Sequence, residues 1–260
     1  MEQEKAISIR DLRMNYGEKQ VLKGINLEIE KGQVIGYIGP NGAGKSTTVK
    51  IMLGLVAGYA GTVEIFGRSI SGGDAEYKRK IGYVPETAEI YETLTAREYL
   101  TFIGELYGLE GGTADRKAMK LVELFGIKEM YDARIAACSK GMKQKVLIIS
   151  SLLHNPEILF LDEPLSGLDA NSVMVVKEIL AQLAGQGKTI FYSSHLMDVV
   201  EKISDRIILL KDGLVVADGS FDDLKSQSRE GSLEAIFNEL TGFHEHRSIA
   251  EEFVSVVEEV

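Results

Sequence analysis

Apolar and polar residues alternate in short runs over residues 7–29, and the runs are broken at Tyr16-Gly17 and Lys23-Gly24. Strict alternation is typical of half-buried strands, and glycine-containing breaks between such runs are typical of turns. This part of the chain therefore predicts twisted antiparallel strands.

A different pattern begins at residue 33, where a nearly continuous apolar run enters a glycine-rich turn and helical spacing follows over residues 46–55. Short apolar runs then alternate with helical periodicity. Further strands are predicted at 62–66, 80–84, 158–162, 189–193, 206–210 and 214–217, and helices at 95–107, 113–125, 140–153, 169–183 and 196–203. This order predicts an α/β fold, with a mostly parallel core sheet covered by helices on both faces.

Two segments stand outside this alternation. The helix-rich stretch of residues 93–150 is interpreted as an α-helical subdomain inserted into the sheet domain. In the tail, residues 243–260, apolar side chains recur at Ile249, Phe253, Val256 and Val257 with acids between them. This spacing predicts a short helix that packs on its own domain or on a dimer mate.

The composition limits the classes of protein to which this chain can belong. The 260 residues carry a formal net charge of −10 and a pI near 5.1, which argues against nucleic acid as the main partner. The single cysteine, Cys138, excludes an internal disulfide framework and is interpreted as a buried, unreactive thiol in a reducing cytosol. Apolar runs are too short to cross a bilayer, and the acidic start lacks an export signal.

The glycine-rich turn after the buried strand matches the pattern G-x-x-x-x-G-K-[ST] and lies between a strand and a helix, as that pattern requires. Its residues are Gly39, Pro40, Asn41, Gly42, Ala43, Gly44, Lys45 and Ser46, followed by Thr47. Main-chain N–H groups turned inward by the glycines would cradle phosphates. Lys45 would reach the β- and γ-phosphates, and Ser46 would bind Mg²⁺. The plain alternative is a glycine-rich turn before a capped helix.

Two acids, Asp162 and Glu163, end the buried strand of residues 158–162, and Pro164 follows them. Ligands of open α/β sheets bind at the carboxyl ends of the strands. Asp162 would hold Mg²⁺, and Glu163 would orient the water that attacks the γ-phosphate. Considered without the glycine-rich loop, these two acids could also be the solvent-exposed end of a strand.

With both phosphate motifs in place, residues 7–242 resemble the ATPase subunits of ABC transporters. The resemblance implies a P-loop NTPase with a mostly parallel core sheet, an N-terminal antiparallel β subdomain and the helical insertion. The segment from Cys138 to Lys145 lies where that family has its signature, usually Leu-Ser-Gly-Gly-Gln. Ser139, which would also cap the helix that follows, and Gly141 are retained. They would donate to a γ-phosphate held by the opposite subunit, so the resemblance implies a dimer.

Further residues resemble family motifs. The segment from Ser166 to Asp169 resembles the loop that couples the two active sites across the dimer, and His195 resembles the histidine that hydrogen-bonds the γ-phosphate. Tyr16 resembles the aromatic residue that stacks on adenine, although core packing would also explain it. Glu86 stands where the family usually has glutamine. It could contribute to the Mg²⁺ site, or it could face the partner and never contact the metal.

The signature, Glu86 and residues 232–242 are similar to an exporter subgroup that works with separate six-helix membrane subunits. The resemblance implies ATP hydrolysis that powers export, with residues 1–242 as the ATPase domain and the protein peripheral on the cytoplasmic face of the membrane. Two alternatives remain open. One is a soluble ABC ATPase that acts on ribosomes or DNA, and the other is a non-hydrolysing nucleotide sensor.

Overall fold

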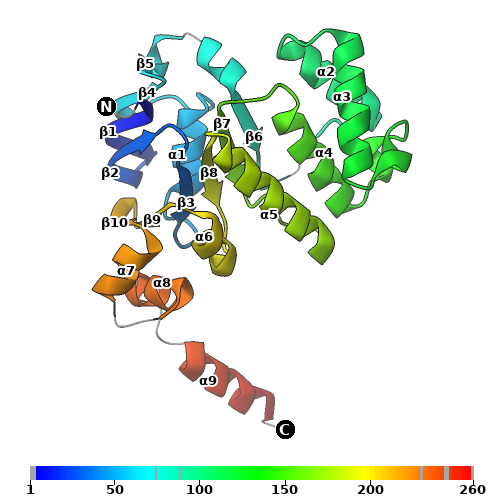
Figure 1. The fold of residues 1–260 in the computed structure, drawn as a ribbon. Helices are drawn as coiled ribbons and strands as arrows, with labels where there is room; N and C mark the ends of the chain where they lie inside the picture. The colour runs from blue at the N-terminus through cyan, green and yellow to red at the C-terminus, as the bar shows by residue number, and fades with distance from the viewer. Residues whose placement is uncertain (1–3, 74, 88–89, 229–230, 243–245, 259–260) are drawn as a thin grey trace.

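The computed structural model describes residues 4–258 except 74, 88–89, 229–230 and 243–245. Two sheets form its centre (Figure 1). The smaller sheet is antiparallel and contains β1 (Lys5–Tyr16), β2 (Lys19–Glu30), β4 (Ala60–Ile65) and β5 (Arg68–Ser69), in the order β2-β1-β4-β5. The prediction of antiparallel strands near the N-terminus is therefore confirmed.

The larger sheet has the order β10-β9-β3-β8-β7-β6, and only the β9–β10 pair in it is antiparallel. Its strands are β3 (Val34–Ile38), β6 (Ile81–Val84), β7 (Ile158–Asp162), β8 (Thr189–Ser193), β9 (Arg206–Lys211) and β10 (Leu214–Gly219). Every residue of β3, β7 and β8 is buried. Parallel neighbours end at the same edge of the sheet, so the segments that follow β3, β7 and β8 meet there.

Helices cover both faces of the larger sheet, as the sequence predicted. They are α1 (Lys45–Met52), α2 (Ala96–Leu106), α3 (Gly111–Leu124), α4 (Lys140–Leu152), α5 (Ala170–Gly185), α6 (Met197–Ile203), α7 (Phe221–Gln227), α8 (Leu233–Thr241) and α9 (His246–Glu258). Four short 3₁₀ turns lie at Ile70–Gly72, Glu76–Lys80, Lys128–Met130 and Ile135–Ala137.

Helices α2, α3 and α4 group at one side of the sheet domain (Figure 1). Thr95 and Glu98 form a capping box at the start of α2, and the Ser139 hydroxyl caps α4 by accepting from the N–H of Met142 at 3.2 Å. The predicted cap at Ser139 is confirmed. The subdomain limits of 93–150 and the domain limit at 242 stay predictions.

Two expectations in the first third of the chain were wrong. Strand β2 is not broken at Lys23-Gly24 but continues through it, because Gly24, at φ 106°, is an extra residue opposite β1. Such a β-bulge bends a strand without ending it. Helix α1 ends at Met52 rather than at residue 55, because Gly54 adopts φ 62° and its N–H donates to the Ile51 carbonyl.

The tail forms the predicted helix, α9, although residues 243–245 and 259–260 and the side chain of Ile249 lie outside what the structure describes. Phe253, Val256 and Val257 are exposed to 61–69%. The sequence predicted packing on its own domain or on a dimer mate, and within the single chain its own domain leaves these three side chains exposed. None of the helices in the described ranges is long and apolar enough to span a bilayer.

The core beneath the site depends on aromatic packing. The ring of Phe191 lies 4.7 Å from Tyr37 and 5.6 Å from Phe160 between centroids, so adjacent parallel strands are joined by tilted aromatic contacts. We expect Phe160→Ala to lower the free energy of unfolding by about 3–5 kcal/mol, because it leaves a cavity under β7. Phe102→Ala, at an exposed position of α2, serves as the control.

Urea denaturation followed by circular dichroism measures both changes. The control substitution should alter the free energy of unfolding by no more than about 0.5 kcal/mol. Equal destabilisation by the two variants would contradict the assignment of Phe160 to the central core.

Candidate active site

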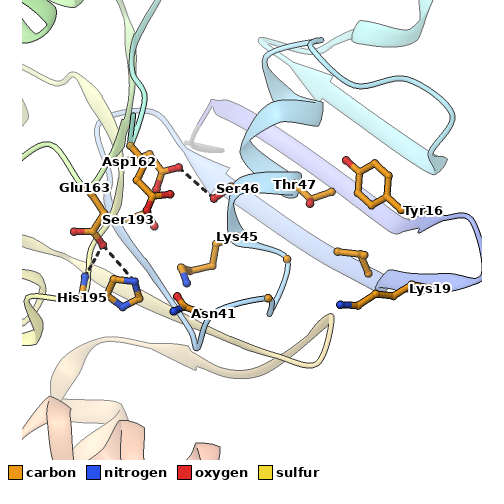
Figure 2. Close-up of a pocket in the computed structure, with 14 residues that line it drawn as sticks. Tyr16, Lys19, Asn41, Lys45, Ser46, Thr47, Asp162, Glu163, Ser193 and His195 are labelled. Atoms are coloured by element: carbon orange, nitrogen blue, oxygen red, sulfur yellow. Dashed lines mark hydrogen bonds and ion pairs between the residues drawn. The ribbon is translucent and has the colours of Figure 1, made fainter. Parts of the chain in front are cut away.

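A cavity of about 400 Å³ lies at the carboxyl ends of β3, β7 and β8 (Figure 2). It brings together most of the residues that the sequence singled out. Those that line it are Tyr16, Asn41, Gly42, Gly44, Lys45, Ser46, Thr47, Glu86, Asp162, Glu163 and His195. They come from segments more than 100 residues apart in the chain.

The loop between β3 and α1 forms one wall. Gly42 and Gly44 adopt φ angles of 80° and 108°, positive values that glycine adopts at no steric cost. A Cβ atom on Gly44 would also approach the Leu22 side chain to 2.5 Å. Gly44 lies at the N-terminus of α1, where unpaired N–H groups favour a negatively charged ligand. This geometry suits a bound phosphate.

Gly39, Pro40 and Ala43 belong to the same loop but do not line the cavity. The Lys45 ammonium donates to the carbonyl of Gly39 at 2.6 Å and to that of Pro40 at 3.3 Å, and the N–H of Ala43 donates to Pro40 at 3.2 Å. These residues shape the loop from behind. Burial lowers the pKa of Lys45, and the acids facing it, Asp162 foremost, oppose that shift.

Asp162 ends β7 and is only 5% exposed. The Ser46 hydroxyl donates to its Oδ2 atom at 3.3 Å, which joins the end of β7 to the first turn of α1. Burial raises the pKa of Asp162, and the negative charge of Glu86 raises it further. Glu86 follows β6 and also lines the cavity, so three carboxylates face one small volume.

The Glu163 carboxylate is held in place by the segment after β8. It accepts from the His195 N–H at 2.7 Å and from the Ser194 hydroxyl at 3.2 Å, and the His195 ring Nε2 lies 3.7 Å from Oε1. Glu163 also adopts φ 48°, a left-handed conformation that costs energy in a residue other than glycine. Burial raises the pKa of Glu163, which suits a group that accepts a proton.

The donor set fits a hard divalent cation. Ser46 and Asp162 present oxygen atoms to the same point, and burial leaves the carboxylate short of solvation that a cation would supply. Over the described ranges no group of three or more His, Cys, Asp or Glu side chains could hold a metal by itself. Protein sites bind Mg²⁺ through one or two carboxylates together with phosphates and water.

The cavity also contains residues that the sequence analysis missed. Lys19 and Val21 start β2, and Lys19 pairs with Tyr16 across the turn, so its cation lies at the Tyr16 end of the cavity (Figure 2). Ser193 ends β8 opposite Asp162 in the sheet register. Its position directly before Ser194-His195 is the signal that could have revealed it.

Ser139, Gly141 and Asp169 lie outside this cavity. A Cβ atom on Gly141 would come within 2.6 Å of the Gly167 carbonyl, and Lys140 Nζ donates to Ser166 at 3.2 Å. The start of α4 is therefore packed against the loop that precedes α5.

The Asp169 carboxylate caps α5 by accepting from the Ser172 hydroxyl at 2.5 Å and from the Ser172 N–H at 3.0 Å, and these two hydrogen bonds lower the pKa of Asp169 to about 2. Cys138, just before α4, is buried as expected, and burial raises the pKa of its thiol.

Known proteins are similar to this chain in sequence and in fold. The family model described as "ABC transporter" matches residues 22–166. The linearmycin resistance ATP-binding protein LnrL of Bacillus subtilis is 39% identical over 85% of this chain and 71% of its own length. The Nod factor export ATP-binding protein I of Ralstonia nicotianae is 33% identical over 84% of this chain and 68% of its own.

Among solved structures, an ATP-binding subunit of an ABC transporter is 34% identical with a TM-score of 0.85, covering 91% of this chain and 99% of that one. A dimeric ATP-binding cassette, in a post-hydrolysis state with ADP and Pi, is 26% identical with a TM-score of 0.76. That match covers 82% of this chain and 98% of the other.

Proposed function

Because the chain belongs to the ABC transporter family, as an ATP-binding and ATP-hydrolysing subunit, we propose that it powers export through separate transmembrane subunits. It acts at the cytoplasmic face of the membrane, bound to those subunits. The export function of the Ralstonia relative supports the direction of transport. The observation that carries the proposal is the convergence of Lys45, Asp162 and Glu163 in one cavity.

Each wall of the cavity has a part in binding ATP. Tyr16 stacks on adenine, and the exposed face of its ring at the rim of the cavity supports this role. Main-chain N–H groups of the loop between β3 and α1 surround the phosphates, and Lys45 contacts the β- and γ-phosphates. Ser46 and Asp162 hold Mg²⁺, with Glu86 as a further oxygen donor. Bound there, the metal neutralises phosphate charge.

Glu163 and His195 act at the γ-phosphate. Glu163 holds the attacking water and accepts its proton, for which its raised pKa and its two hydrogen bonds from Ser194 and His195 prepare it. The His195 ring donates to the γ-phosphate. Because the main chain of His195 also orients Glu163, one short segment after β8 positions both groups.

A second subunit completes the site. Ser139 and Gly141 lie outside the cavity of their own chain, and they donate to the γ-phosphate bound by the opposite subunit. Asp169, at the start of α5, couples the two sites across the dimer. Two ATP molecules between the subunits act as an adhesive layer, and hydrolysis removes the γ-phosphate contact so that the dimer opens.

The membrane subunits receive this motion through the helical subdomain and the loop of Glu86. A second cavity of about 380 Å³ supports this route, because Pro85 and Glu86 line it together with Leu147 of α4. Glu86 therefore lies between the nucleotide and the helical subdomain. Neither relative described above bears the name of a ribosome or DNA factor, and the net charge of −10 likewise favours transport over the nucleic-acid alternative.

Replacing Lys45 or Glu163 separates binding from hydrolysis. We expect Lys45→Ala to weaken ATP binding strongly, because the phosphates lose their buried cation. Glu163→Gln should keep ATP binding, lower turnover about a hundredfold or more, and trap an ATP-bound dimer. Phosphate release and binding of a fluorescent ATP analogue measure the two effects. Equal turnover by wild type and Glu163→Gln would contradict the role assigned to Glu163 in hydrolysis.

Replacing Glu86 tests the unusual third carboxylate. We expect Glu86→Gln to keep magnesium-dependent ATP hydrolysis. Asp162 is inactive when protonated, and removing the Glu86 charge lowers the pKa of Asp162, so activity should persist to lower pH than in wild type. Phosphate release measured across pH tests this shift. Complete loss of hydrolysis would show that the carboxylate itself is required.

The membrane partner is tested by affinity purification of the tagged chain from detergent-solubilised membranes. A hydrophobic, multi-helix protein should accompany the chain in a fixed ratio, whereas untagged cells serve as the control. Recovery of ribosomal RNA in place of a membrane protein would support the ribosomal alternative.

A further inference from the structure

Helix α9 presents an apolar face that its own domain does not cover. Phe253, Val254, Val256 and Val257 are between 52% and 69% exposed. Their spacing of three and four residues places them on one side of the helix, and Glu252 and Ser255 lie on the other. The helix extends away from the two sheets (Figure 1).

A helix of this length is marginal in water by itself, because nucleation is costly and only a packed face repays it. Helices α7 and α8, immediately before it, contact the body of the protein, with Leu224, Leu233 and Ile236 buried in its core. The contrast between α8 and α9 indicates that α9 packs against something outside its own chain.

The charge of α9 argues against a lipid surface as that partner. Helices that lie on membranes carry Lys and Arg on their polar face. Helix α9 contains one basic residue, Arg247 in its first turn, and three acids, Glu251, Glu252 and Glu258. Anionic headgroups would repel such a face. The membrane subunits are also poorly placed, because α9 lies at the opposite end of the molecule from α2 and α3 (Figure 1).

We propose that the apolar face of α9 packs against α9 of a second copy of this chain. The inference rests on the dimeric architecture of the family and not on export. In a two-fold symmetric dimer each copy presents the same surface to its mate, so one exposed apolar helix finds an identical one. Pairing of this kind also makes the two ATPase subunits identical.

The contacts between α8 and the His195 segment support a second copy of the chain as the partner of α9. The N–H of Leu233, at the start of α8, donates to Glu201 of α6 at 3.3 Å. Ser232 and Glu234 share a cavity of about 320 Å³ with His195, which precedes α6. The segment that leads into α9 is therefore attached directly behind the His195 loop, where the second subunit binds.

The small area of the apolar face of α9 limits the strength of the contact between the two α9 helices. Four side chains bury much less than the roughly 800 Å² per partner of a standard interface. The α9 contact is therefore weak alone and becomes effective once the nucleotide interface supplies a high local concentration. It strengthens an existing dimer and holds the subunits in their mutual register.

Sedimentation of the full chain with Mg²⁺ and a non-hydrolysable ATP analogue tests the pairing. Phe253→Glu should raise the dimer dissociation constant about tenfold or more, because it places a charge in an apolar contact. Ser255→Glu is the matched control on the polar face and should leave the constant within about twofold of wild type. Equal effects of the two variants, or no effect of Phe253→Glu, would overturn the inference.

Cross-linking gives a second readout that does not depend on stability. The sole native cysteine, Cys138, is buried, so a single introduced thiol can be followed. With a short bis-maleimide, Phe253→Cys, Val256→Cys or Val257→Cys should form covalent dimers, whereas Ser255→Cys should not. Failure at all three apolar positions, or cross-linking to a membrane subunit in purified transporter, refutes the pairing.

Phosphate release and affinity for the ATP analogue are measured on the same preparations. If nucleotide is bound and hydrolysed while α9 does not cross-link, only the pairing fails. If nucleotide is not bound at all, the proposed function fails with it. The two proposals are therefore distinguishable.

Discussion

The rest of the structure depends on charge held at the edge of a buried sheet. Burial disfavours the charged forms of Lys45, Asp162 and Glu163 alike, since it lowers the pKa of the amine and raises those of the acids. Mutual attraction and hydrogen bonds oppose this effect of burial. A bound triphosphate would neutralise the charge of Lys45, and a cation bound with it would neutralise the acids.

The backbone around the cavity also adopts conformations that are unfavourable for most residues. Gly42 and Gly44, which line the cavity, adopt positive φ angles, and Glu163 adopts φ 48° at the end of β7. Phe160, three residues before Glu163, contacts Phe191 in the same buried cluster as Ala43 of the loop. The core thus supports a local conformation that would be unfavourable by itself, and the side chains are oriented as a result.

The residues proposed to act across the dimer also make structural contacts within their own chain. Ser139 caps α4, Gly141 lies against the Gly167 carbonyl, and Asp169 caps α5. These contacts connect the signature to the loop that leads from Glu163 into α5. In the proposed dimer, a shift at the site of hydrolysis would reach the surface that faces the other subunit through this backbone, and the proposed α9 contact would extend that surface.

Local pattern was enough to predict the phosphate loop, the acids at the end of β7, the cap at Ser139 and most strands, because neighbouring residues determine these features. Only the tertiary structure showed that Gly24 forms a bulge within β2, that Lys19 and Ser193 face the cavity, and that the apolar side of α9 is exposed. Strand register and packing between distant segments decide those three features. A sequence pattern states which residues prefer burial, but which surface covers them follows from how the whole chain folds.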